Sequence, residues 1–190
     1  MGIERNKRIL YFGGGFFMFN LVNLDDVRKE MVNEIQSDIE NGRLYISERL
    51  TSEGKRQYPN ILLESAIQKD VEGFIQMLGI HFFNSHYPRK NSKGGYTNVT
   101  MPEDANRTLC EGEFNRFYIR GLCLKAISLG HTTVTAYRAR PSKNPRPESV
   151  AIENKEFDAN KLLSDLRNNP GVNTAFGLPP GPNSGMSAKL

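Results

Sequence analysis

The segment "CEGEFNRFYIRGLCLKA", residues 110–126, brings acidic, basic and apolar side chains together at helical spacing. Glu113, Arg116 and Arg120 occur at i, i+3 and i+7, which places them along one edge of a helix, exposed or half-buried, where the carboxylate can pair with the guanidiniums. Ion pairs of this kind are common on solvated helix faces and contribute little to stability. One hypothesis is therefore a solvated ion-pair ladder with no direct role in function.

The alternative hypothesis is a functional basic face that extends beyond this helix. Arg138 and Arg140 alternate onto one side of the strand predicted to follow, and Lys143 and Arg146 lie in the loop after it. Guanidiniums that converge there would bind phosphate or carboxylate groups through planar bidentate contacts. The candidate binding residues are Glu113, Arg116, Arg120, Arg138, Arg140, Lys143 and Arg146.

The distribution of charge indicates two kinds of partner. The formal net charge is +4, but residues 25–79 contain eleven acidic and seven basic residues, for a charge of −4, whereas residues 107–147 contain eight basic and two acidic residues, for +6. Opposed patches on one chain favour head-to-tail contacts between copies. A basic segment also attracts nucleic acid, on which Tyr118 or Tyr137 could stack.

Enzymatic chemistry has less support in the sequence. Cys110 lies in the first turn of the predicted helix, where a helix dipole could lower its pKa, with His131 or His86 as a base. Glu111 and Glu113 oppose a thiolate there. A further alternative is hydrolysis or phosphoryl transfer by Glu113 with the neighbouring arginines, and we expect an enzyme less than a binding protein.

No cofactor or metal site is predicted. His81 and His86 are five residues apart, which is wrong for one helical face, and no nearby Cys or Asp completes a ligand set. Cys110 and Cys123 are thirteen residues apart in one helical pattern, so they cannot pair with each other. Unpaired cysteines fit a reducing cytoplasm.

These residues are positioned by a predicted mixture of helices and a few strands. The pattern predicts helices over 24–41 and 158–169 and over most of 50–79, where Pro59 opens one of two or three short helices. A capping box at Thr108 and Glu111 predicts the start of a helix that ends near Gly130. Strands are predicted at 43–47, 96–101, 131–139 and 150–152, and a solvated loop at 84–95. The expected fold class is α+β, a single compact domain with a small, mainly antiparallel sheet.

The two ends of the chain differ in composition from the middle. Residues 1–17 are interpreted as an annotation extension before a true start at Met18, or else as an N-terminal arm, and their apolar run is too short to span a membrane. Residues 18–167 form the predicted domain. Residues 168–190 are rich in Pro, Gly and Asn, which predicts an irregular tail that wraps over the surface or docks onto a partner.

Several stretches together resemble a family of small, largely uncharacterised proteins from tailed phages and prophages: "GRLYISERL", "GGYTNVTMP", "TLCEGEFNRFYIRGLCLKAI", "NPRPES" and "LPPGPNSGMSAKL". The resemblance implies a mobile-element origin and a location in the host cytoplasm or the virion. The leading hypothesis is a non-enzymatic interaction or assembly protein that docks through residues 107–147 and the C-terminal tail. Its alternative is a nucleic-acid-binding protein that uses the same arginines, and no membrane partner is expected.

Overall fold

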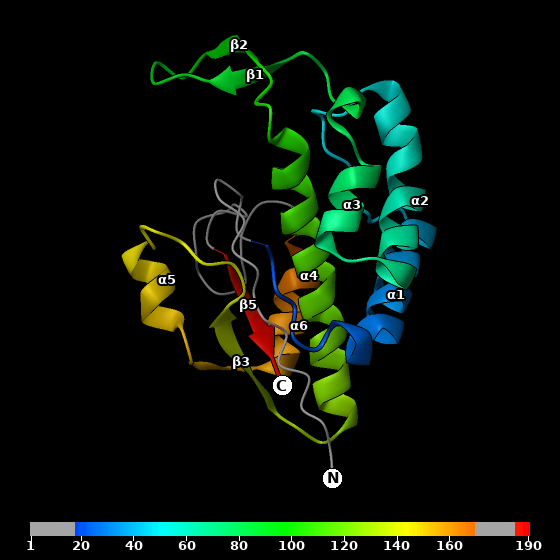
Figure 1. Cartoon of the computed structure of the whole chain (residues 1–190), viewed down its shortest axis with the longest axis vertical. Coiled ribbons are helices and arrows are strands. Elements are labelled where there is room, and N and C mark those ends of the chain that lie inside the picture. Colours follow the sequence, from blue (N-terminus) through cyan, green and yellow to red (C-terminus); the bar gives the residue numbers. More distant parts are fainter. Residues whose placement is uncertain (1–17, 170–184) are drawn as a thin grey trace.

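One long helix runs through the middle of the molecule, and a second packs against its side (Figure 1). The computed structural model describes residues 18–169 and 185–190. α1 (Leu24–Glu40) packs along α4 (Ala105–Ser128), and its apolar positions at helical spacing are fully buried against the core. α4 is buried on all sides over residues 116–123, as expected for a stretch of helix surrounded by other elements.

The close approach of α1 and α4 depends on a glycine. A Cβ atom at Gly121 would lie 2.7 Å from the backbone nitrogen of Met31, closer than side chains approach a backbone. Only glycine lets the two helices meet at this distance. α6 (Ala159–Asn168) packs against α4, and Asp158 caps it, because its carboxylate accepts a hydrogen bond from the Lys161 nitrogen.

The segment between α1 and α4 forms helices and a hairpin. α2 (Ser52–Gln68) begins at Thr51, whose hydroxyl accepts a hydrogen bond from Gly54, and α3 (Val71–Met77) follows, with a single 3₁₀ turn, η1 (Ile80–Phe82), after it. Pro59 lies inside α2 and does not open a helix, so that prediction is wrong. Beyond η1, β1 (His86–Lys90) and β2 (Tyr96–Thr100) form an antiparallel hairpin.

A second antiparallel sheet has the strand order β4-β3-β5. β3 (Thr133–Arg138) confirms the predicted strand, and it pairs with β4 (Glu156–Asp158) and β5 (Met186–Lys189). The prediction that the whole C-terminal tail is irregular is wrong, because residues 186–189 are paired and mostly buried. The architecture is α+β with small antiparallel sheets, as the sequence predicts.

Other local predictions differ from the structure. Residues 43–47 form no strand and run as a loop, and residues 150–152 belong to α5 (Pro147–Ile152). Thr108 lies inside α4, which starts three residues earlier, because the Thr108 nitrogen already bonds to the Asp104 carbonyl. His86–Lys90, predicted as loop, is strand β1. Residues 1–17 and 170–184 lie outside the described residues.

No helix in the described ranges is both long and apolar enough to cross a membrane.

Candidate functional site: the hairpin pocket

The predicted basic edge of α4 faces α1 and lies inside the protein. Arg120 is 1% exposed, and its Nε donates to Glu34 Oε2 at 2.8 Å. Its two terminal nitrogens donate to the two carboxylate oxygens of Asp38 at 2.6 and 3.1 Å. Arg167 on α6 adds a second bidentate contact to Glu34 at 2.9 and 2.5 Å. Arg120 therefore joins α4 to α1 through two buried carboxylates.

These contacts explain the pKa values of the two acids. Burial alone would raise the pKa of Glu34, but the hydrogen bonds from Arg167 and Arg120 outweigh it and lower the pKa. The pKa of Asp38 is likewise lowered, since the contact with Arg120 outweighs burial. Both carboxylates are therefore charged partners of buried guanidiniums at neutral pH.

Arg116 is also buried, at 7% exposed, and it forms an ion pair with Glu113. The ring of Phe117 lies 4.7 Å from the guanidinium of Arg116 and 4.7 Å from that of Arg120. The structure thus confirms that Glu113 and Arg116 pair, but the pair is not on a solvated face. A binding role that requires these side chains at the surface has no support in this geometry.

The remaining arginines of the predicted face pair elsewhere. Arg138 contacts Glu153, with Nη2 at 3.1 Å from the carboxylate, and Arg140 Nη1 lies 3.1 Å from Glu111 Oε2. Lys143 is exposed and Arg146 is half-buried at the start of α5. The two arginines of α4 and the two at and just after the end of β3 therefore do not converge on one open surface, contrary to the functional hypothesis.

The predicted nucleophile is unsuited to catalysis. Cys110 is fully buried, and burial raises the pKa of its thiol well above the usual value, with the nearby charge of Glu111 acting in the same direction. Burial raises the pKa of Cys123 to about 12. Both cysteines are free, as predicted. Among residues 18–169 and 185–190, no three His, Cys, Asp or Glu side chains are grouped as metal ligands.

A different surface concentrates cations around a cavity. The hairpin formed by β1 and β2 extends from one end of the molecule in Figure 1, and its residues 86–100 include three cations and no acid. Arg89, Lys90 and Lys93 are exposed, and no ion pair or hydrogen bond joins their charged side-chain groups to another described residue. The hairpin is therefore an open cationic surface within the described residues.

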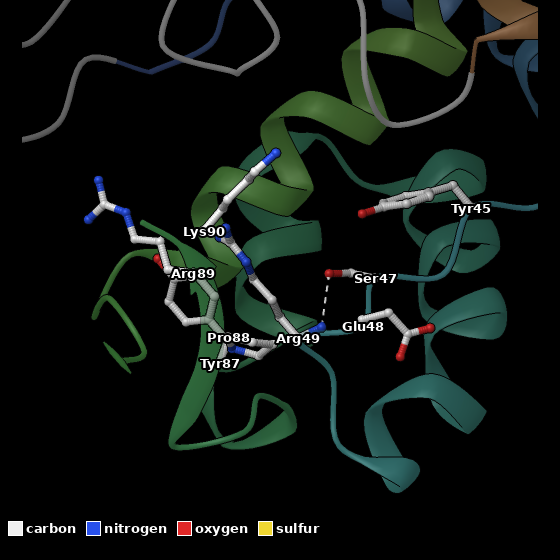
Figure 2. A pocket seen from close by; sticks show the side chains of 8 residues that line it. All are labelled: Tyr45, Ser47, Glu48, Arg49, Tyr87, Pro88, Arg89 and Lys90. Carbon is white, nitrogen blue, oxygen red and sulfur yellow. Dashed lines mark hydrogen bonds between the residues drawn. The ribbon is translucent and has the colours of Figure 1, made fainter. Parts of the chain in front are cut away.

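The cavity, here called the hairpin pocket, lies between β1 and the loop that follows α1. It has a volume of about 360 Å³. Figure 2 shows one group of its residues on each side, with the Arg49 side chain between them. The lining residues are Tyr45, Ser47, Glu48, Arg49, Tyr87, Pro88, Arg89 and Lys90.

Backbone hydrogen bonds hold the two sides of the hairpin pocket in place. Asn84 donates its backbone nitrogen to the Arg49 carbonyl at 2.9 Å and its side-chain nitrogen to the Leu50 carbonyl at 3.2 Å. Leu50 and Phe83 form an isolated antiparallel bridge. The loop and the base of the hairpin are therefore tied together, so the pocket is a built feature of the fold.

The turn of the hairpin is closed by one asparagine. Asn91 Oδ1 accepts hydrogen bonds from the nitrogens of Lys93 and Gly95, both at 3.0 Å, and the Asn91 nitrogen bonds to the Gly95 carbonyl. Gly94 has a φ of +84°, a conformation that glycine adopts without strain. This turn projects Lys93 beyond the end of the strands.

The polar chemistry inside the hairpin pocket is cationic and aromatic. The Arg49 guanidinium lies 4.2 Å from the centre of the Tyr87 ring, a cation–π contact. The only carboxylate of the lining, Glu48, pairs with Lys55 at 2.5 Å. Figure 2 shows the Tyr45 hydroxyl pointing into the space between the two sides. The arrangement can hold an anionic group next to a flat ring.

The sequence contained a signal for this site that the prediction used only in part. The composition predicts a solvated loop for "NSHYPRKNSKGG" and a strand for "YTNVTM". Two extended segments joined by a glycine-containing turn are a hairpin signal. The loop at residues 45–49 could not be placed, because its neighbour lies some forty residues further along the chain.

No protein family model matches this chain, and no curated protein or solved structure is significantly similar to it. The phage or prophage origin implied by the resemblance stays a prediction.

Proposed function

We propose that this chain binds single-stranded nucleic acid in the hairpin pocket and along the adjoining hairpin. The observation that carries the proposal is the combination of unpaired, exposed cations on β1 and in the turn with a pocket that contains two tyrosines. Proteins that bind single strands combine a positively charged path for the backbone with aromatic rings for the bases.

Electrostatics supports the cationic path. Arg89, Lys90 and Lys93 follow each other along β1 and the turn, and no acid occurs in the hairpin to oppose them. Glu48 is the only acid in the pocket lining, and its charge is compensated by Lys55. A phosphate backbone that crosses the pocket would therefore meet a net positive field.

The shape of the site favours single strands over duplexes. Tyr45 and Tyr87 flank an open cavity of about 360 Å³, where an unstacked base can contact an aromatic ring. The bases of a duplex are stacked on each other and do not offer that contact. The guanidinium of Arg49 adds a second flat surface on which a base can stack. Base edges have few specific partners in the lining, so we expect binding with little sequence preference.

The lining supports binding and offers no nucleophile with a base. Ser47 is buried, and its hydroxyl accepts a hydrogen bond from the Arg49 nitrogen at 3.3 Å. No histidine or cysteine belongs to the lining. The hydrolase or phosphoryl-transfer alternative has less support still, because Glu113 is buried and paired with Arg116.

Docking of a protein partner through residues 107–147 remains a hypothesis, but fewer cations of this segment are accessible than the sequence predicts. Of its cations, Lys143 and Arg146 retain solvent access, whereas Arg116 and Arg120 are used within the core. This difference is the basis for a matched test.

The test measures binding of a fluorescently labelled oligo-dT strand by anisotropy at several salt concentrations. We expect the affinity of the wild type to fall as salt rises from about 50 to 200 mM. The logarithm of the binding constant should decrease linearly with the logarithm of salt concentration, by a slope of about 0.7 for each phosphate that the protein contacts. The variant Arg89→Glu/Lys90→Glu should bind at least about tenfold more weakly. The slope of its salt dependence should decrease by the amount that corresponds to one or two lost phosphate contacts.

The control variant is Lys143→Glu/Arg146→Glu, which changes the net charge by the same amount at the other basic loop. We expect it to bind almost as the wild type does. Equal loss in both variants would mean that only net charge matters. Loss confined to the control would assign binding to residues 107–147 and overturn the proposal, as would a wild type that binds no strand at low salt.

A further inference from the structure

The outer edge of β2 is an open strand edge, and two backbone hydrogen bonds at the ends of the hairpin show which backbone groups face outward. The Met101 nitrogen donates to the Ser85 carbonyl, and the Asn91 nitrogen donates to the Gly95 carbonyl, both at 2.8 Å. Hydrogen-bonded pairs alternate along an antiparallel ladder. In the observed register, residues 96, 98 and 100 therefore direct their backbone N–H and C=O groups away from β1.

The two outer edges of the hairpin differ. On β1, Pro88 occupies the central outward position, where it has no N–H to donate, and this edge faces the hairpin pocket. On β2, the outward residues are Tyr96, Asn98 and Thr100, all exposed, and each has a free N–H. Natural sheets block open edges with prolines, charges or bulges. The hairpin has such a block on β1 and none on β2.

The geometry points to β2 as a pairing surface for β2 of a second copy of this chain. In an antiparallel pair centred on Asn98, Tyr96 would lie opposite Thr100 of the second copy, and Thr97 opposite Val99. Aromatic and β-branched residues are favourable cross-strand neighbours. The strand is thus complementary to itself.

The placement of charge favours a second copy over another partner. β2 has no charged residue, whereas Arg89, Lys90 and Lys93 lie on β1 and in the turn. Pairing through β2 would therefore put the two sets of cations on the outer sides of a four-stranded sheet. An acidic peptide would find no positive side chain on β2 itself to select it.

The position of β2 leaves room for this contact. Figure 1 shows β2 on the outer side of the hairpin, with β1 between it and the helices. Two copies could pair through β2 with their helical bodies on opposite sides. A seam of five residues is smaller than a standard stable interface, which buries at least about 1,200 Å². We therefore expect a reversible dimer that dissociates on dilution.

The first test is sedimentation velocity over a wide range of protein concentration. The wild type should shift from a mass of 21.5 kDa toward twice that value as concentration rises. Asn98→Pro removes one outward N–H without touching the bonds between β1 and β2, and Asn98→Lys places two like charges at the centre of the seam. Both variants should stay monomeric, and Asn98→Ser, which keeps the N–H and adds no charge, should still dimerise.

The second test is a disulfide that only this register allows. Residues directly opposite each other in a hydrogen-bonded pair have Cα atoms about 5.5 Å apart, within disulfide reach. Both native cysteines are buried, so the thiol of Asn98→Cys would be the exposed one. Mild oxidation should link it to its counterpart, whereas Lys93→Cys in the turn should link much less.

Two outcomes would overturn the inference: a wild type that stays monomeric at high concentration, or an Asn98→Pro variant that dimerises as the wild type does. The inference does not depend on the proposed function. A monomer that still binds oligo-dT would refute the dimer alone, and a dimer without affinity for the strand would refute nucleic-acid binding alone.

Discussion

Replacing Arg120 by leucine should destabilise the fold more than most single changes. The side chain is 1% exposed and makes three hydrogen bonds to Glu34 and Asp38. Its loss leaves two buried carboxylates with reduced compensation, although Arg167 still contacts Glu34 and Arg43 still lies 3.5 Å from Asp38. Removing one partner of a buried pair costs about 3–5 kcal/mol. For a domain of this size, the corresponding fall in Tm is about 6 to 20 °C.

The dependence on pH gives this prediction a second signature. The pKa values of Glu34 and Asp38 lie below their ordinary values of 4.5 and 3.8, since contacts with arginine outweigh burial. A carboxylate with a lowered pKa stabilises the fold above its ordinary pKa, and this contribution is lost as the pH falls through the folded-state pKa. In Arg120→Leu, the carboxylates no longer have Arg120 as a partner, so the variant lacks much of this stabilisation at any pH. The stability difference between wild type and variant should therefore shrink as the pH falls below 4.5.

The assay is urea unfolding followed by circular dichroism at neutral and acidic pH. Arg56→Leu is the control, because the Arg56 side chain is 71% exposed and its pair with Glu53 should contribute no more than about 1 kcal/mol. Combining Arg120→Leu with Asp38→Leu should recover part of the loss. The reasoning fails if Arg120→Leu costs no more than Arg56→Leu, or if its cost is the same at both pH values.

Two further substitutions test other parts of the core by the same urea assay. Tyr58→Phe should leave the stability unchanged or raise it by about 1 kcal/mol, because the Tyr58 hydroxyl is fully buried and has no hydrogen-bond partner among the described residues; a loss above that size would reveal a partner. Gly121→Ala should cost about 1–3 kcal/mol, because the added Cβ would lie 2.7 Å from the Met31 nitrogen, and an unchanged midpoint would mean that α1 and α4 separate freely.

Periodicity predicted the helices well and their burial poorly. The spacing of apolar residues predicted α1 and α6, and placed Glu113, Arg116 and Arg120 together on one edge of α4. Whether that edge meets solvent depends on which helix packs against it, and a single helix pattern has no information on its neighbour. Arg120 is buried because it pairs with the carboxylates of Glu34 and Asp38, which lie more than seventy residues earlier in the chain.

Short segments were predicted less well than long ones because fewer residues define their pattern. Residues 43–47 alternate like a strand, but the nitrogens of Arg43 and Leu44 both bond to the Asp38 carbonyl at the end of α1, and no strand of the described residues pairs with them. The strand at 186–189 shows the opposite case. Its composition favours irregular structure, yet Asn115 on α4 holds it by donating to the Met186 carbonyl and accepting from the Ser187 hydroxyl.

The opposed charges of the two segments have a physical explanation within one chain. Arg120 pairs with Glu34 and Asp38, and Arg107 pairs with Glu72 at 2.6 and 3.0 Å, so cations of the basic segment meet acids of the acidic segment inside the fold. Contacts between copies are not needed to satisfy these charges.

The buried ion pairs reduce the part of the net charge of +4 that a partner can sense. Cations that are buried beside carboxylates contribute little to the field outside the protein, because each is compensated at short range. The external field near the molecule depends instead on side chains that remain exposed and unpaired. Arg89, Lys90 and Lys93 are three of these on one hairpin without an acid, so a basic partner-binding surface is more reasonably placed there than in the segment with the highest formal charge.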